Sequence, residues 1–168
     1  YMKRLKTILT IFVLATLPAL AQEDLKIGEL FYNEHTEELK SNPKGNIKAG
    51  RDYSINQSLV SEISIQGQHL KPYNLTLFRS VTFENGETMV KQIEEWIEAD
   101  SRDAYDKEVG RLKGQLYYGF FCLPPQKGKR RYLFYRNAAL QPNSKDQSLT
   151  VAYMEGYATL EQLKEMFK

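Results

Sequence analysis

Alternation of apolar and polar side chains is the first signal along this chain. Between residues 74 and 83, Leu75, Val81 and Phe83 fall on one side of an extended chain, and threonine and serine fall on the other. Arg79 interrupts the apolar side. Similar alternation, or apolar runs bounded by turn residues, predicts five strands: 59–65, 74–83, 115–123, 131–137 and 149–154.

Helical spacing of apolar residues appears in two places. Val90, Ile93 and Ile97 predict a helix that runs on to about residue 104, with glutamates on its exposed face. Near the end of the chain, Thr159 and Gln162 have the spacing of a capping box and predict the start of a last helix.

The N-terminal part gives a weaker pattern. A short helix is predicted over 29–40, and the glycine-, proline- and asparagine-rich stretch 41–58 is predicted to be a flexible loop or insertion. The order of elements, with three strands in succession, favours one α+β domain over 22–168. We expect a mostly antiparallel sheet of four to five strands, a meander with helices packed on one face.

The aromatic content of the central hairpin changes this picture. Leu116, Tyr118 and Phe120 are predicted to point one way along the strand, and Tyr117, Phe121 and Leu123 the other way. A sheet with one face in water would alternate apolar and polar residues. Both faces must therefore be covered, either by the N-terminal segment or helices on both sides, or by a ligand or partner.

Tyrosine suits a recognition surface because it buries a ring and keeps a hydroxyl for hydrogen bonding. The second alternative therefore predicts a tyrosine-lined ligand surface with two arginines as polar anchors. Its residues are Tyr117, Tyr132, Tyr135, Tyr153, Arg131 and Arg136.

The start of the chain has the pattern of a secretory signal peptide. Three basic residues precede an apolar run over 8–17, and Pro18 and an Ala-Leu-Ala triplet follow it. Cleavage is predicted between Ala21 and Gln22, with a periplasmic or secreted mature protein. The apolar run is about half the length that a membrane-spanning helix needs, so no transmembrane anchor is expected.

The predicted cleavage changes the net charge of the chain. The whole chain carries 23 basic and 21 acidic residues, and residues 1–21 hold three of the basic and none of the acidic ones, which leaves the mature domain at −1. Such a balance gives no general attraction to nucleic acid. The cationic hairpin loop with Lys127, Lys129 and Arg130 remains a candidate anion-binding site.

No residue pattern indicates a catalytic, metal or cofactor site. Cys122 is the one cysteine, and its apolar neighbours indicate a buried side chain; His35 or His69 would have to activate it. Asp100, Asp103 and Asp106 lack the glycine and glutamate of an EF-hand and are interpreted as a solvated helix end.

Several segments resemble a known group. The runs Gly114–Phe121, Leu123–Pro125, Arg131–Asn137 and Tyr153–Leu160 resemble small secreted Bacteroidota domains of unknown function, over about residues 59–168. The resemblance implies an envelope location and gives no activity.

Three functional hypotheses follow. The first is an exported, non-enzymatic envelope module that binds a glycan, a peptide or a protein partner. The alternatives are a small secreted hydrolase that uses Cys122 or a carboxylate, and a homodimer formed through the aromatic sheet face.

Overall fold

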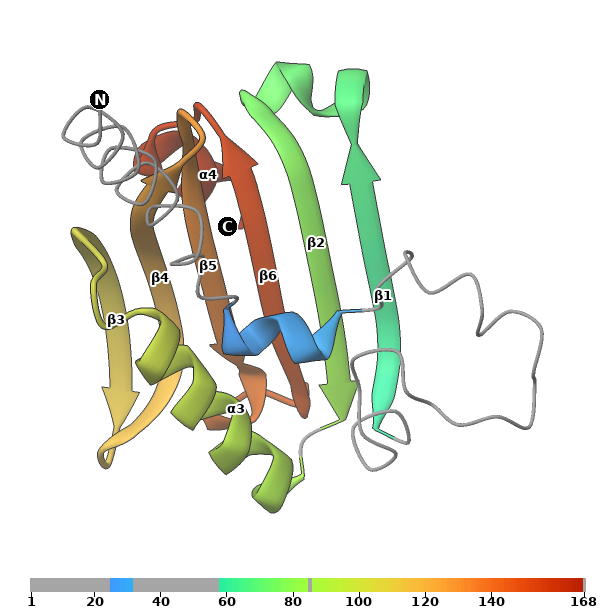
Figure 1. Cartoon of the computed structure of the whole chain (residues 1–168). Helices are drawn as coiled ribbons and strands as arrows, with labels where there is room; N and C mark the ends of the chain where they lie inside the picture. Colours follow the sequence, from blue (N-terminus) through green and yellow to red (C-terminus); the bar gives the residue numbers. More distant parts are fainter. Residues whose placement is uncertain (1–24, 32–57, 85, 168) are drawn as a thin grey trace, which may run out of the picture.

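Six strands form one open antiparallel sheet in the order β1-β2-β6-β5-β4-β3 (Figure 1). The computed structural model describes residues 25–31, 58–84 and 86–167. The strands are β1 (Leu59–Gln66), β2 (Leu75–Glu84), β3 (Asp106–Leu112), β4 (Gln115–Gln126), β5 (Lys129–Asn137) and β6 (Ser148–Gly156). The helices are α3 (Glu87–Asp100) and α4 (Leu160–Met166), with 3-10 helices η2 (Lys26–Leu30), η4 (Gly67–Tyr73) and η5 (Ala138–Leu140).

The α+β class with an antiparallel sheet is confirmed. The sheet has six strands rather than four to five, because β3 was not predicted. The three strands in succession, β4, β5 and β6, pair in order as the predicted meander, and β6 also pairs with β2, which was not predicted. The predicted signal peptide and the segment 41–57 lie outside the described residues.

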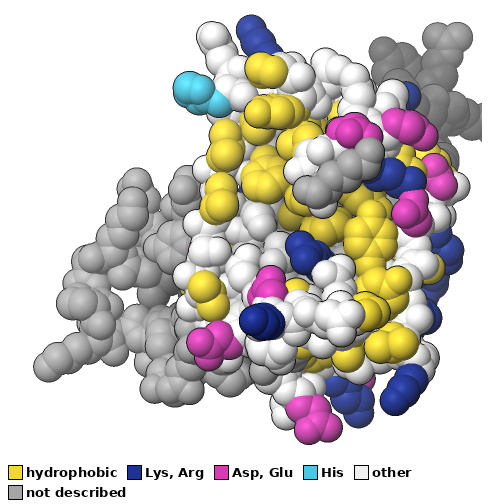
Figure 2. All heavy atoms as spheres, turned by 180° about the vertical axis from the view of Figure 1, so that it is seen from behind, with side chains coloured by type: hydrophobic (Ala, Val, Ile, Leu, Met, Phe, Trp, Pro, Cys, Tyr) yellow, Lys and Arg dark blue, Asp and Glu magenta, His cyan; other side chains and the backbone are white. Residues whose placement is uncertain are grey.

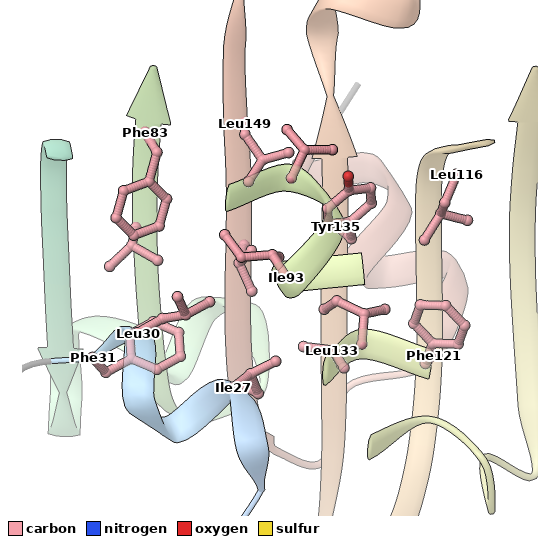
Figure 3. Packing of buried hydrophobic residues seen from close by; sticks show 14 of the residues in the cluster. Ile27, Leu30, Phe31, Phe83, Ile93, Leu116, Phe121, Leu133, Tyr135 and Leu149 are labelled. Carbon is pink, nitrogen blue, oxygen red and sulfur yellow. The ribbon is translucent and has the colours of Figure 1, made fainter. Parts of the chain in front are cut away.

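Helix α3 and η2 cover one face of the sheet, which we call the α3 face (Figure 1). Figure 3 shows Ile93 of α3 and Ile27 of η2 lying over Leu133 and Tyr135 of the sheet. Each aliphatic side chain buried in this way contributes about 1.5–3 kcal/mol relative to exposure. The buried residues of the core on the α3 face are Ile27, Leu30, Phe31, Val81, Phe83, Val90, Ile93, Ile97, Leu116, Phe121, Leu123, Leu133, Tyr135, Leu149 and Val151.

Helix α4 lies on the opposite face, which we call the α4 face, and covers one end of it (Figure 1). Phe167, which ends this helix, stacks on Phe134 of β5 with ring centroids 4.4 Å apart. The capping box predicted from sequence is present, because Thr159 and Gln162 each bond the other's backbone. The prediction of helices on a single face is therefore wrong, and the two-sided apolar pattern of β4 and β5 is explained by a core on each face.

The described N-terminal segment is a single 3-10 turn rather than the start of the helix predicted over 29–40. The carboxylate of Asp100 holds it, because its oxygens accept hydrogen bonds from the backbone N–H groups of Lys26 at 2.9 Å and Ile27 at 2.8 Å. These two hydrogen bonds connect η2 to the last residue of α3, so the two elements that cover the α3 face are held together. Residues 32–40 are not among those described.

Helix α3 ends at Asp100 instead of running on to residue 104, and Ser101 is its C-cap. The interpretation of Asp100, Asp103 and Asp106 as one solvated helix end is therefore wrong. Asp106 begins strand β3, which alternates too little to be predicted because most of its side chains are exposed.

A β-bulge in β4 changes which residues share a face. Leu116 pairs with Arg111, but Gly110 pairs with Tyr118, so Tyr117 is an extra residue in the ladder. Leu116 consequently packs in the α3-face core with Phe121, not on the same side as Tyr118. The predicted grouping of these side chains is wrong at this point, because a bulge shifts the alternation by one residue.

Candidate functional site

Two of the tyrosines predicted to line a ligand surface are internal. Tyr132 is 1% exposed in the α4-face core, where its hydroxyl donates to the carbonyl oxygen of Ala158. Tyr135 is 0% exposed on the other face, and its hydroxyl donates to Glu94 Oε1 of α3 at 3.0 Å. Each hydroxyl thus bonds to a part of the chain packed on the sheet, and both rings are almost fully buried.

Tyr153 and Arg131 lie together at one end of the α3 face. The hydroxyl of half-buried Tyr153 donates to Glu155 Oε1 at 2.9 Å, and burial raises the pKa of this tyrosine. Arg131 lies opposite Glu155 on the next strand, and its Nε donates to the carbonyl oxygen of Pro124 at 2.8 Å. These two residues lie near each other, but their polar groups already have partners within the protein.

Tyr117 and Arg136 belong to the α4 face. A Cβ added to Gly110 would lie 2.5 Å from the nearest atom of the Tyr117 ring, so this ring packs against Gly110. Gly110 is on the same side of β3 as Glu108, which forms an ion pair with Lys164 of α4. Arg136 donates from Nη2 to Gln141 Oε1 at 3.0 Å, and its Nε is buried without a hydrogen-bond partner. The six predicted ligand residues are thus divided between two faces and do not form one surface.

The cationic loop is a tight hairpin turn between β4 and β5. Lys127 and Gly128 adopt positive φ angles of 51° and 75°, as a two-residue turn requires, and Gln126 pairs with Lys129 across it. Arg130 turns away from the tip, because its Nη1 donates to the carbonyl oxygen of Ala158 at 3.3 Å. The three cations predicted as one anion site therefore belong to two places.

Arg130 lines a cavity that the sequence did not predict. The cavity has a volume of about 320 Å³ and lies where the start of β3, the β4–β5 hairpin and the first turn of α4 meet. Charged side chains surround it and tyrosines and a thiol form part of its wall. Its lining residues are Tyr105, Asp106, Cys122, Arg130, Tyr132, Thr159, Leu160 and Glu161.

Cys122 is 3% exposed at this cavity, and its carbonyl oxygen accepts a hydrogen bond from the backbone N–H of Tyr105 at 3.0 Å. Burial raises the pKa of its thiol, followed by the repulsion that Asp106 exerts on a thiolate. A catalytic cysteine needs the opposite shift. His69, the one histidine among the described residues, is exposed in η4 and does not line the cavity, and His35 is outside the described residues.

Across residues 25–31, 58–84 and 86–167, no group of three or more His, Cys, Asp or Glu is placed to hold a metal ion. Within the same part of the chain, no helix combines the length and the apolar character that crossing a bilayer requires.

The two edges of the sheet differ in a way that bears on recognition. Four of the seven residues of β3 are charged: Asp106, Lys107, Glu108 and Arg111. Strand β1, at the other edge, has eight residues and one charge, Glu62. Natural proteins guard exposed edges with charge or proline, and β1 has neither a lysine nor a proline.

Strand β1 also exposes aliphatic side chains. Val60, Ile63 and Ile65 are 60%, 48% and 36% exposed. Ile65 pairs with Phe78, which stacks against Phe167, so Ile65 and Ile63 point to the α4 face. Figure 2 shows this side of the molecule, where hydrophobic side chains extend over much of the surface. Among the described residues, only β2 pairs with β1.

Comparison with known proteins gives a family without an assigned activity. No curated protein and no solved structure matches the chain. Its sequence matches a family of unknown function, DUF6108, over residues 14–167, which is nearly its whole length and includes both cores and the β1 edge. The chain therefore belongs to the DUF6108 family of unknown function.

Proposed function

We propose that this chain is an exported, non-enzymatic binding module that holds an extended polypeptide along the outer edge of β1. The observation that carries the proposal is the contrast between the two edges, with β3 guarded by charges and β1 aliphatic and uncharged except at Glu62. Export is supported by the basic, apolar and small-residue pattern of residues 1–21. Periplasmic or secreted location remains part of this proposal.

An open strand edge recognises a polypeptide in two ways at once. Backbone groups of β1 on the side away from β2, which pair with no other described strand, supply hydrogen bonds to the backbone of an added strand. Alternate side chains of the same strand supply apolar contacts, here Ile63 and Ile65, which face the same side. A glycan would use the first of these features poorly, since it has no regular row of amide donors and carbonyl acceptors. The geometry therefore favours a peptide or protein partner.

The α4 face next to β1 extends the apolar contact. Phe78 on β2 is partly exposed, and Tyr73 at the end of η4 is 48% exposed. Between β1 and the core, the same face has small polar side chains, Ser80 and Thr82, paired with Ile63 and Ser61. Side chains of a bound strand that point to this face would meet Ile63 and Ile65 first.

The test is a selection of displayed random peptides, each at least as long as the eight residues of β1, on immobilised residues 22–168. Synthetic versions of the selected peptides are then titrated with the wild type, Ile63→Lys and Val109→Lys. Val109 is the matched control, because it is 44% exposed on the opposite edge strand. We expect Ile63→Lys to weaken binding by about tenfold or more, since one buried aliphatic side chain contributes about 1.5–3 kcal/mol.

The outcomes separate the possible occupants. Equal weakening by the two substitutions, or selected peptides whose binding neither substitution changes, would contradict a site at β1. Light scattering over a range of concentrations tests whether a second copy of the chain occupies the edge instead. A wild-type dimer that Ile63→Lys converts to a monomer would show that the edge pairs with a second copy of the chain instead. Retained thermal unfolding of each variant establishes that the fold is intact.

A further inference from the structure

The cavity beside α4 is separate from the β1 edge. Its lining comes from β3, β4, β5 and the first turn of α4, and β3 is at the opposite edge of the sheet from β1. Its volume of about 320 Å³ is at the small end of the range for ligand sites, about 300–1,000 Å³. It therefore has room for a small molecule but not for a polymer.

Charges of both signs line this cavity without neutralising each other. Arg130 is on one side, and the carboxylates of Asp106 and Glu161 also line it. All three residues are exposed, and in the described part of the chain no ion pair joins any of them to another side chain. Oppositely charged groups that border one cavity unpaired suit a ligand that carries both charges.

Arg130 is held in place for such a ligand. Its Nη1 donates to the carbonyl oxygen of Ala158 at 3.3 Å, which fixes the guanidinium and leaves its other N–H groups available. A guanidinium presents its donors as a planar fork that matches the two oxygens of a carboxylate. Arg130 is therefore suited to the carboxylate of a ligand, and Asp106 and Glu161 to its ammonium.

The inner wall of the cavity has its own polar groups satisfied. The hydroxyl of Tyr132 donates to the carbonyl oxygen of Ala158, and the backbone N–H of Tyr105 donates to the carbonyl oxygen of Cys122 at 3.0 Å. Leu160, partly buried, adds an aliphatic surface. A ligand gains little from further hydrogen bonds there, whereas an apolar side chain would be shielded from water.

We propose that this cavity binds a small zwitterion with an apolar side chain, such as a free amino acid or a dipeptide. The carboxylate lies at the Arg130 guanidinium, the ammonium lies by Asp106 and Glu161, and the side chain contacts Leu160 and the thiol of Cys122. This binding is independent of the polypeptide site, because the two sites share no residue.

Calorimetric titration of residues 22–168 tests both the charge requirement and the size of the ligand. The probes are leucine, leucyl-leucine, N-acetyl-leucine, which lacks the ammonium, and leucinamide, which lacks the carboxylate. We expect leucine or leucyl-leucine to bind, and each blocked analogue to bind at least about tenfold more weakly, because charge-assisted hydrogen bonds are lost. Whether leucine or leucyl-leucine binds more tightly distinguishes an amino-acid site from a dipeptide site.

Three variants locate the site. Arg130→Gln and Glu161→Gln should each weaken zwitterion binding by about tenfold, whereas Lys127→Gln on the same hairpin should leave it unchanged. Glu161 is exposed on α4, so its substitution keeps the test valid if Arg130→Gln disturbs the hairpin. Absence of binding by both zwitterions, equal binding of the blocked analogues, or binding that neither pocket variant weakens would overturn the proposal.

Discussion

Replacing Tyr135 by phenylalanine tests whether the sheet holds α3 through a hydrogen bond to a charged group. The ring of Tyr135 is 0% exposed, and its hydroxyl donates to Glu94 Oε1 at 3.0 Å. Phenylalanine keeps the ring in the core and removes only the hydroxyl. The substitution therefore isolates one interaction between β5 and α3.

The expected cost follows from the charge and exposure of the acceptor. A hydrogen bond to a charged group contributes about 1.5–3 kcal/mol. Glu94 is only partly buried, so water can replace part of the lost bond. We therefore expect Tyr135→Phe to lower the free energy of unfolding by about 1–2 kcal/mol at pH 7.

The same interaction predicts the dependence on pH. Burial raises the pKa of Glu94 above its usual 4.5, although the bond from Tyr135 acts to lower it. A carboxyl with a raised folded pKa contributes stability that is present below the unfolded pKa and is lost as the pH rises through the folded pKa. Without the hydroxyl, the folded pKa rises further, so the variant loses more stability than the wild type over this range. The difference between the two proteins should be largest at pH 7 and smaller below about pH 4.

Urea unfolding at both pH values measures this difference, with far-UV circular dichroism as the signal. Glu94→Gln provides the control background, because its amide oxygen still accepts a hydrogen bond but does not titrate. In that background the cost of Tyr135→Phe should not change with pH. A cost that is the same at pH 7 and pH 4 in the wild-type background would refute the reasoning.

Three further predictions concern other contacts. Asp100→Asn removes one of the two acceptors for the backbone of η2, and we expect a loss of about 1 kcal/mol in urea unfolding and faster amide exchange at Lys26 or Ile27. Gly156→Ala places a Cβ 2.5 Å from the carbonyl oxygen of Asn74 and 2.6 Å from the Cα of Leu75. Since backbone atoms of β2 cannot move aside singly, we expect a loss of about 1–3 kcal/mol, checked by the same assay. The thiol of Cys122 is 3% exposed with a raised pKa, so a thiol reagent should label it slowly at neutral pH and rapidly in urea; equal rates would contradict its burial.

The alternation of apolar and polar side chains predicted the strands well where one or both of their faces are buried. The five predicted strands correspond to β1, β2, β4, β5 and β6. The apolar residues of β2, β4, β5 and β6 pack in a core, whereas β1 was predicted from an alternation of side chains that are mostly exposed. Strand β3 was missed because an edge strand with exposed side chains has no apolar periodicity to detect. The pairing of β6 with β2 was also missed, since pairing partners far apart in sequence leave no local signal.

The candidate sites were harder to predict than the strands. Tyr132 and Tyr135 were selected because they are tyrosines on a two-sided strand, but helices cover both sides at these positions. The β1 edge had a readable signal, since Ile63 and Ile65 alternate with Ser64 and no lysine or proline interrupts them. The cavity had none, because it is assembled from β3, β4, β5 and α4.

The central place of the last strand has a consequence for how the chain is made. Strand β6 is the only one that joins the β1–β2 pair to the β3–β4–β5 group. A nascent chain that ends before Ser148 therefore leaves two incomplete half-sheets with open edges, and neither core is closed. Folding must wait until synthesis is almost finished. Truncation near the C-terminus is therefore far more damaging than loss of an edge strand.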